Sequence, residues 1–250
     1  MIKFFRHIRK SLLMENKTGK PALQAGRYFK YAIGEILLVV IGILIALSIN
    51  NWNENRINSN KETVILANIH KEFTKNKIQL DTMVSKLKKT HSNCTKIMSL
   101  FPIKSKPVTE VLDSLSGYLW GSYGGLTFNP SQSSINALTS TSSFNIINDE
   151  KLRALLISWN DLIIDYQEEE QASREYMWNQ YDPYLSIHFD FNFDFKDSRN
   201  NSEALQTLKF EYMVKRRHEL IGIILTSSGE LQKVQETIDK IIELSKSKNN

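Results

Sequence analysis

The stretch 28–52 reads YFKYAIGEILLVVIGILIALSINNW, and it decides how the rest of the chain is organised. Its apolar part, Tyr31–Ile49, has 19 residues and a single charge, Glu35. At about 1.5 Å of rise per residue, a helix of this length spans about 28 Å, close to the roughly 30 Å of hydrocarbon in a bilayer. The sequence therefore predicts a transmembrane helix over residues 31–50.

Aromatic residues flank this apolar run. Tyr28 and Tyr31 stand at its start and Trp52 at its end, and such amphipathic rings favour the headgroup level of a membrane. We expect these three residues to be interfacial anchors. The alternative is a buried core helix of a soluble protein, which would need partner side chains on all sides and would leave the flanking charges unexplained.

The distribution of charge predicts the orientation of the span. Residues 1–31 hold eight of the 32 Lys and Arg residues and one of the 27 acidic residues. The positive-inside rule therefore places a basic tail, residues 1–30, in the cytoplasm and residues 51–250 on the other side of the membrane. Because the basic balance of the chain belongs to the tail, it is no argument for a nucleic-acid partner.

The start of the chain allows two further interpretations. Ala46 and Ser48 form a small-x-small site after the apolar run, as in a cleaved signal peptide. The charged region before it would then be about 30 residues, unusually long, so we expect an uncleaved anchor. The segment IKFFRHIRKSLL, residues 2–13, suits either an amphipathic helix on the anionic inner leaflet or a basic flank that only orients insertion.

One face of the span carries a possible helix contact. Glu35, Gly42 and Ala46 are separated by seven and four residues, so a helix places them on one side. Gly42 and Ala46 have the small-xxx-small spacing that lets two helix backbones approach closely, and a carboxylate near the boundary can bond across a helix pair. We expect this face to mediate a membrane helix contact. The alternative is a glutamate that reaches the headgroups beside incidental small residues.

The span and its flanks resemble a known signature. The run YAIGEILLVVIGILIALSINNWNENR, residues 31–56, is similar to the opening of an uncharacterised family of single-pass membrane proteins in Bacteroidota, a family built on a domain of unknown function. The basic residues 2–17 and the segment 127–156 share the likeness. The resemblance implies an inner-membrane protein with a periplasmic helical domain, and it brings no activity or catalytic residue. Residues 19–26 depart from the family as extra linker.

Beyond the span, apolar residues recur in alternating steps of three and four, which predicts a helix over residues 53–100. The stripe consists of Leu66, Ile69, Phe73, Asn76, Leu80, Met83, Leu87, Thr90, Cys94 and Ile97. Asn76 is a polar residue of the kind that fixes register. Residues 202–247 carry a second stripe in a predicted helix. We expect residues 60–100 to pair with 205–245 in an antiparallel, coiled-coil-like bundle.

The middle of the chain predicts shorter elements. Helices are expected over residues 109–120 and from Asp149 to a stop at Asp182-Pro183, with a surface loop at 121–134 between them. Phenylalanines alternate with polar residues in 187–195, which predicts a short extended segment with one aromatic face. The fold class is therefore mainly α: one transmembrane helix followed by a helical periplasmic domain.

The search for catalytic motifs yields no candidate. Asp190, Asn192 and Asp194 open an EF-hand-like spacing, but Phe195 stands where glycine is required. Cys94 is the only cysteine, so no intramolecular disulfide forms. We therefore predict no catalytic, cofactor-binding or metal-binding residue.

Two classes of function follow. The favoured one is a membrane-anchored scaffold or sensor-like module of the cell envelope, whose partners are the lipid bilayer and either a second copy or another envelope protein. The alternative is a periplasmic enzyme whose site the sequence does not reveal. A pocket with several carboxylates or histidines would favour the enzyme, and an exposed apolar stripe would favour the scaffold.

Overall fold

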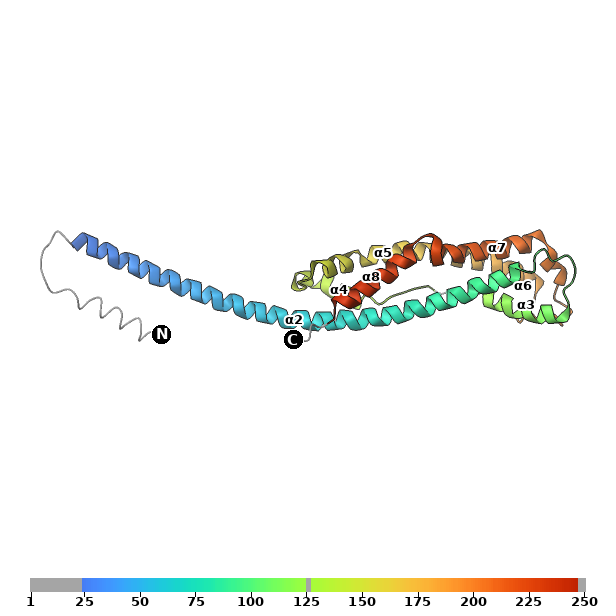
Figure 1. Cartoon of the computed structure of the whole chain (residues 1–250), viewed down its shortest axis with the longest axis horizontal. Coiled ribbons are helices and arrows are strands. Elements are labelled where there is room, and N and C mark those ends of the chain that lie inside the picture. The colour runs from blue at the N-terminus through green and yellow to red at the C-terminus, as the bar shows by residue number, and fades with distance from the viewer. Residues whose placement is uncertain (1–23, 125–126, 247–250) are drawn as a thin grey trace. The chain divides into compact units, whose positions relative to one another are not determined.

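The structure is a computed structural model that describes residues 24–124 and 127–246. Its first element, α2, is a helix from Gln24 to Met98 (Figure 1). No proline occurs between Pro21 and Pro102, so every residue in this interval has the backbone N–H that a helix requires. The predicted span and the predicted outer helix thus belong to one element, which ends before Pro102 as expected.

The chain divides into two compact units between Asn58 and Ser59, and each is described by itself. In the first unit, the side chains of the apolar run 31–49 are all exposed. An 18-residue window of this helix is apolar and long enough to cross a membrane, and none of it is buried. The helix is therefore compatible with a single-pass membrane protein.

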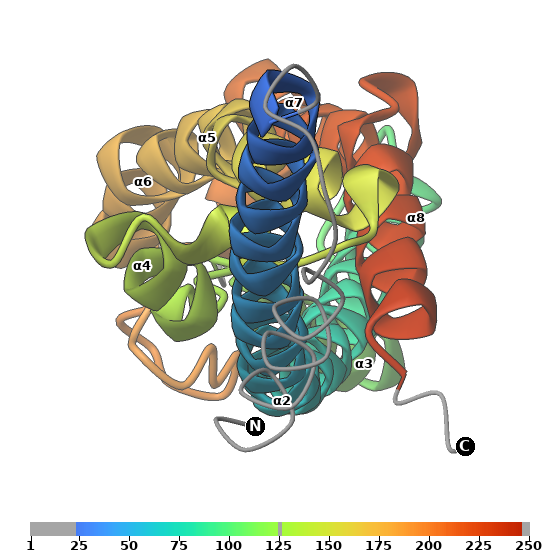
Figure 2. The same ribbon diagram turned by 90° about the vertical axis from the view of Figure 1, so that its left-hand side faces the viewer.

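The second unit consists of helices, with no strand among the residues that the structure describes. Besides the later part of α2 it contains α3 (Thr109–Ser122), α4 (Ser133–Ser140), η2 (Ser143–Ile146), α5 (Glu150–Tyr176), η3 (Met177–Tyr181), α6 (Asp182–His188), η4 (Ser202–Gln206), α7 (Leu208–Gly222), η5 (Ile223–Ser227) and α8 (Glu230–Leu244). Of these, η3 and η5 are π-helical turns. Seen end-on, α4 and α8 lie on opposite sides of the unit (Figure 2).

Side-chain caps begin two of the long helices. Asp149 accepts a hydrogen bond from the N–H of Leu152 at 2.9 Å, at the start of α5. Thr207 accepts one from the N–H of Phe210 at 3.1 Å, at the start of α7. Each cap satisfies a backbone donor that the first turn of a helix leaves without a partner. The predicted helix start at Asp149 is confirmed.

The helices at the two ends of this unit run antiparallel, as predicted. Near the start of the unit, His70 donates from Nδ1 to the carbonyl of Ile242 at 3.0 Å, and Lys77 forms an ion pair with Asp239. Near the end of α2, Thr95 instead contacts His218. Residues later in α2 therefore contact residues earlier in the α7–α8 segment, as antiparallel helices do.

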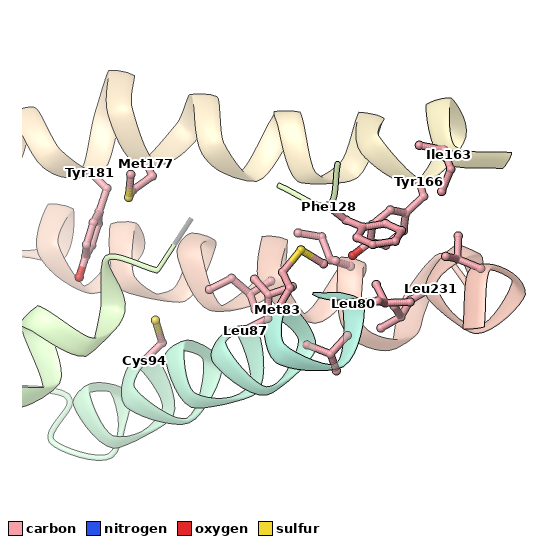
Figure 3. Packing of buried hydrophobic residues seen from close by; sticks show 14 of the residues in the cluster. Leu80, Met83, Leu87, Cys94, Phe128, Ile163, Tyr166, Met177, Tyr181 and Leu231 are labelled. Carbon is pink, nitrogen blue, oxygen red and sulfur yellow. The ribbon is translucent and has the colours of Figure 1, made fainter. Parts of the chain in front are cut away.

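The predicted stripe on α2 faces the core of the second unit. Nine of its ten members are buried, and Leu66 is partly buried against them. Figure 3 shows Leu80, Met83 and Leu87 pointing toward side chains of the neighbouring helices. On the C-terminal helices, the predicted stripe residues are buried as well: Leu220, Ile224, Leu231, Val234, Ile238 and Ile241.

The prediction of an extended segment at 187–195 is wrong. Helix α6 includes residues up to His188, and the residues after it form successive turns. Asp190 explains the turns, because its carboxylate accepts the backbone N–H groups of Asn192 at 3.0 Å and Asp194 at 2.8 Å. Alternation therefore does not give one aromatic face: Phe193 is buried, and Phe191 is 81% exposed.

Two helix boundaries also differ from the prediction. Asp182-Pro183 does not stop the helical path, because the π-helical turn η3 leads directly into α6 and places Pro183 in its first turn, where a missing N–H is tolerated. The C-terminal helix is interrupted at Gly229, whose φ of 75° lies in the left-handed region that glycine adopts without strain.

Replacing Leu80 by Ala tests the core. Leu80 is 1% exposed, so truncation should lower the free energy of unfolding by about 2 to 5 kcal/mol. Ile78 on the same helix is 62% exposed, and Ile78→Ala is the matched control, expected to change little. Denaturant unfolding of the purified chain in detergent measures both. Equal stabilities for the Leu80 variant and the parent would contradict the packing.

Candidate functional site

The residues of the expected membrane contact lie together on α2. Glu35, Gly42 and Ala46 are all exposed, and the helix places them on one face. A β-carbon built on Gly42 would meet nothing within 4 Å, so this surface is open to a second helix. The structure thus places the three residues as the sequence predicts, while their contact with another helix stays a prediction.

The described anchor residues are exposed at the ends of the apolar run. Tyr31 is 37% exposed and Trp52 is 66% exposed. The guanidinium of Arg56 lies over the Trp52 ring, 5.8 Å from its centroid, so an apolar ring and a cation stand together where the run ends. The side chain of Tyr28 and residues 1–23 of the basic tail lie outside what the structure describes.

In the second unit, the most extensive polar site surrounds the segment Thr127–Ser134, here called the strap. The sequence predicts it as part of a surface loop, and this is wrong for Phe128, which is fully buried. The strap has no helical hydrogen bonds of its own before α4, so its buried backbone groups need side-chain partners. Two helices supply them.

Helix α2 holds the strap through three polar side chains. Asn76 makes two bonds of 2.9 Å to Ser131, donating to its carbonyl and accepting from its N–H. Glu72 accepts from the N–H of Ser134 at 2.8 Å, and Gln79 donates to the carbonyl of Asn129. The spacing of four and three residues puts all three on one side of α2.

Helix α5 holds the other side of the strap. Gln167 donates to the carbonyl of Phe128 at 2.7 Å, and Glu170 accepts its N–H at 2.9 Å. Arg174 donates to the hydroxyl of Thr127. The Phe128 ring packs against Tyr166, with centroids 6.3 Å apart (Figure 3).

Glu170 is a carboxylate inside the core. It is 3% exposed, and burial raises its pKa to about 7, although the bond from Phe128 opposes the shift. Its Oε1 and the hydroxyl of Tyr166 are both buried without a direct hydrogen bond of good geometry. A proton shared near these two atoms would relieve the cost of the buried charge.

Arg217 is a second buried charge, and it is fully buried. It donates to the carbonyls of Ser122 and Ser173 at 3.3 and 3.0 Å, to the Ser173 hydroxyl at 2.7 Å, and to the carbonyl of Gly124. Burial lowers its pKa. The partners are oxygens at the end of α3 and in α5, so the residue links α7 to these two segments.

Among these residues, the sequence predicts a specific role only for Asn76, as a polar residue that fixes register. Polar residues that recur at helical spacing within or beside an apolar stripe are the signal that could have indicated the others. Glu72, Asn76 and Gln79 show it on α2, and Gln167, Glu170 and Arg174 show it on α5. Arg217 has no such local signal, because its partners are 44 to 95 residues away.

Two shallow grooves open on the second unit. One, of about 260 Å³, lies over the Lys77–Asp239 ion pair with Asp81 at its wall. The other, of about 380 Å³, lies beside Lys71 and Glu72 at the strap. Among the described residues, no group of three or more His, Cys, Asp or Glu side chains is arranged to hold a metal ion.

These features define a mainly helical protein with one candidate membrane span and a helical bundle in which side chains of α2 and α5 hold the strap. The sequence matches the model of a family of unknown function (DUF6090) over residues 35–167. This match covers more than half of the chain, so the protein belongs to that family. No curated protein and no solved structure matches the chain.

The matched region begins at Glu35 in the span and ends at Gln167 beside the strap. It therefore includes the predicted membrane contact face, the α2 stripe and the strap with its α2 clamp. Arg217 and Glu170 lie beyond it. The family accordingly covers the span and the first half of the bundle.

Replacing Glu170 by Gln tests the buried carboxyl. Because its pKa of about 7 in the folded state is above the ordinary value of 4.5, ionisation destabilises the fold, and this cost grows as pH rises from about 4.5 to 7. Gln keeps an acceptor for Phe128 without a charge. The stability of the variant relative to the parent should therefore increase by up to about 1.4 kcal/mol per pH unit in that window.

Denaturant unfolding of both proteins between pH 4.5 and 8 measures this difference. Glu168→Gln on the exposed side of α5 is the control. A difference between the Glu170 variant and the parent that does not change with pH would show that Glu170 is not buried as a titrating acid.

Proposed function

We propose that the protein is a scaffold or sensor-like module anchored in the inner membrane of a bacterium. In this proposal residues 31–50 cross the membrane once, the basic tail is cytoplasmic and the helical bundle is periplasmic. The observation that carries the proposal is the run of exposed apolar side chains on α2, directly followed in the chain by a folded bundle. The charge asymmetry around the span supports the orientation.

The roles of the buried polar residues favour an interaction module over an enzyme. Most hydrogen bonds of Glu170, Arg217 and Asn76 are to backbone groups of the strap and of neighbouring segments. None of the three lines either groove. Their chemistry is thus directed to holding the fold, which leaves the outer surface of the bundle for partners.

The partners in this proposal are the lipid bilayer and either a second copy of the chain or another envelope protein. Tyr28, Tyr31 and Trp52 would anchor the span at the two interfaces. Glu35, Gly42 and Ala46 would form the contact between helices in the bilayer. A nucleic-acid partner has no support, because the excess of basic residues lies in the tail.

Topology fusions test the orientation. Alkaline phosphatase fused after Ile57 should be active, because that position would be periplasmic, and reporters fused before Lys30 should not be exported. Mass spectrometry of the protein purified from membranes gives the amino terminus. A mature form that begins near Ile49 would overturn the uncleaved anchor, and inactive fusions after Ile57 would overturn the orientation.

Gly42→Ile tests the membrane contact. An isoleucine side chain would keep two backbones apart, so it should reduce dimer yield in membrane crosslinking. Glu35→Gln should reduce it less, because hydrogen bonds between spanning helices average only about 0.6 kcal/mol. Leu44→Ala, on the opposite face, is the control. A monomeric parent, or an unchanged yield in Gly42→Ile, would mean that this face contacts lipid.

A further inference from the structure

Two histidines from distant parts of the chain stack on each other where α2 and α7 meet. The rings of His91 and His218 have centroids 3.8 Å apart and planes inclined by 28°. Both side chains are partly buried. His91 also lies against Gly222, where a β-carbon would be 3.5 Å from its Nε2. The two rings thus pack between α2 and α7. Neither histidine belongs to the strap or lines a groove.

The hydrogen bonds of Thr95 fix the proton on His218. The Thr95 hydroxyl donates to the carbonyl of His91 at 3.1 Å, and Nε2 of His218 lies 3.1 Å from the same hydroxyl. A hydroxyl has one proton, so Nε2 of His218 must be the donor to Thr95. In the neutral pair, Nδ1 of His218 is therefore the nitrogen that gains a proton in acid.

The charged residues around the pair give it no nearby counter-charge. Lys88 on α2 lies one helical turn from His91, and Lys215 on α7 lies one turn from His218 but is paired with Glu211. The acidic residues of this part of α7 are already paired, Glu211 with Lys215 and Glu219 with Arg216. On the neighbouring faces, Arg217 points into the core toward Ser122 and Ser173, and Cys94 is buried.

We propose that the His91–His218 stack is a pH-sensitive latch between α2 and α7. The latch is closed while the imidazoles are neutral, because flat rings then pack in direct contact and Thr95 holds one of them. Protonation of both rings places two like charges in contact, and the latch opens.

The direction of the pH dependence follows from the surroundings of the rings. Burial lowers the pKa of both histidines, and the neighbouring His218 lowers the pKa of His91 further. The stabilisation from the neutral stack is therefore present at pH 7 and is lost as pH falls below the ordinary value of 6.5. This is opposite in sign to the effect of Glu170, so variants can separate the two.

The test uses the full chain in detergent micelles, with imidazole NMR titrations and hydrogen exchange of the α7 amides between pH 7.5 and 5. In the parent, both histidines should titrate below 6.5. After correction for intrinsic exchange, opening of α7 should increase about tenfold or more, since each proton taken up by the open state changes the opening equilibrium by up to tenfold per pH unit.

His218→Phe keeps a stacking ring without a charge. In this variant the pKa of His91 should rise toward its ordinary value, because the like charge of His218 is gone while burial still lowers it, and the acid-dependent opening of α7 should become smaller than in the parent. His188→Gln, outside the pair, should leave both observations as in the parent. If His218→Phe does not fold, His91→Phe makes the reciprocal test on His218.

The proposal is overturned if the pKa of His91 does not change in His218→Phe, if the parent shows no acid-dependent opening, or if the opening in the variant is as large as in the parent.

Discussion

The guanidinium of Arg217 sets the tightest constraint on the bundle. A fully buried charge is tolerated only when its donors are bonded, and here the acceptors are backbone carbonyls and one hydroxyl. These acceptors belong to Ser122, Gly124 and Ser173, which come together only when α3, α5 and α7 are packed. Folding of this region is therefore cooperative, because a partly packed bundle would leave the charge without partners. Lysine could not replace the arginine, since an ammonium lacks the planar set of donors that reaches both the end of α3 and α5.

The strap shows the same principle with both neutral and charged side chains as partners. Its backbone enters the core beside Phe128 without strand or helix pairing, so side chains of α2 and α5 provide the bonds. Asn76 does so with both its donor and its acceptor, which fixes the position of Ser131 along α2. In this protein, a polar residue in an apolar stripe therefore fixes the position of the strap along α2. It does not fix the register of a second helix.

The helices could be predicted from the sequence because their causes are local. Apolar spacing gave the stripe on α2, and Pro102 and Asp149 gave boundaries that agree with the structure. The segment 187–195 was mispredicted because alternation of Phe and polar residues imitates a strand, whereas the Asp190 side chain captures the backbone in turns. The strap and Arg217 could not be predicted, because their partners are fixed by tertiary packing between residues far apart in the chain.

The candidate site likewise has a part that could be predicted from the sequence and a part that required the structure. Glu35, Gly42 and Ala46 follow from helical spacing alone, and the structure places them on one exposed face. The apolar stripe on the later part of α2, by contrast, is buried within the bundle. The same side chains cannot pack against a second copy while they form this core. If the protein associates through α2 as proposed, the contact would therefore rest on the span, where packing of small residues would contribute more than a hydrogen bond, and any other partner would bind side chains that the bundle leaves exposed.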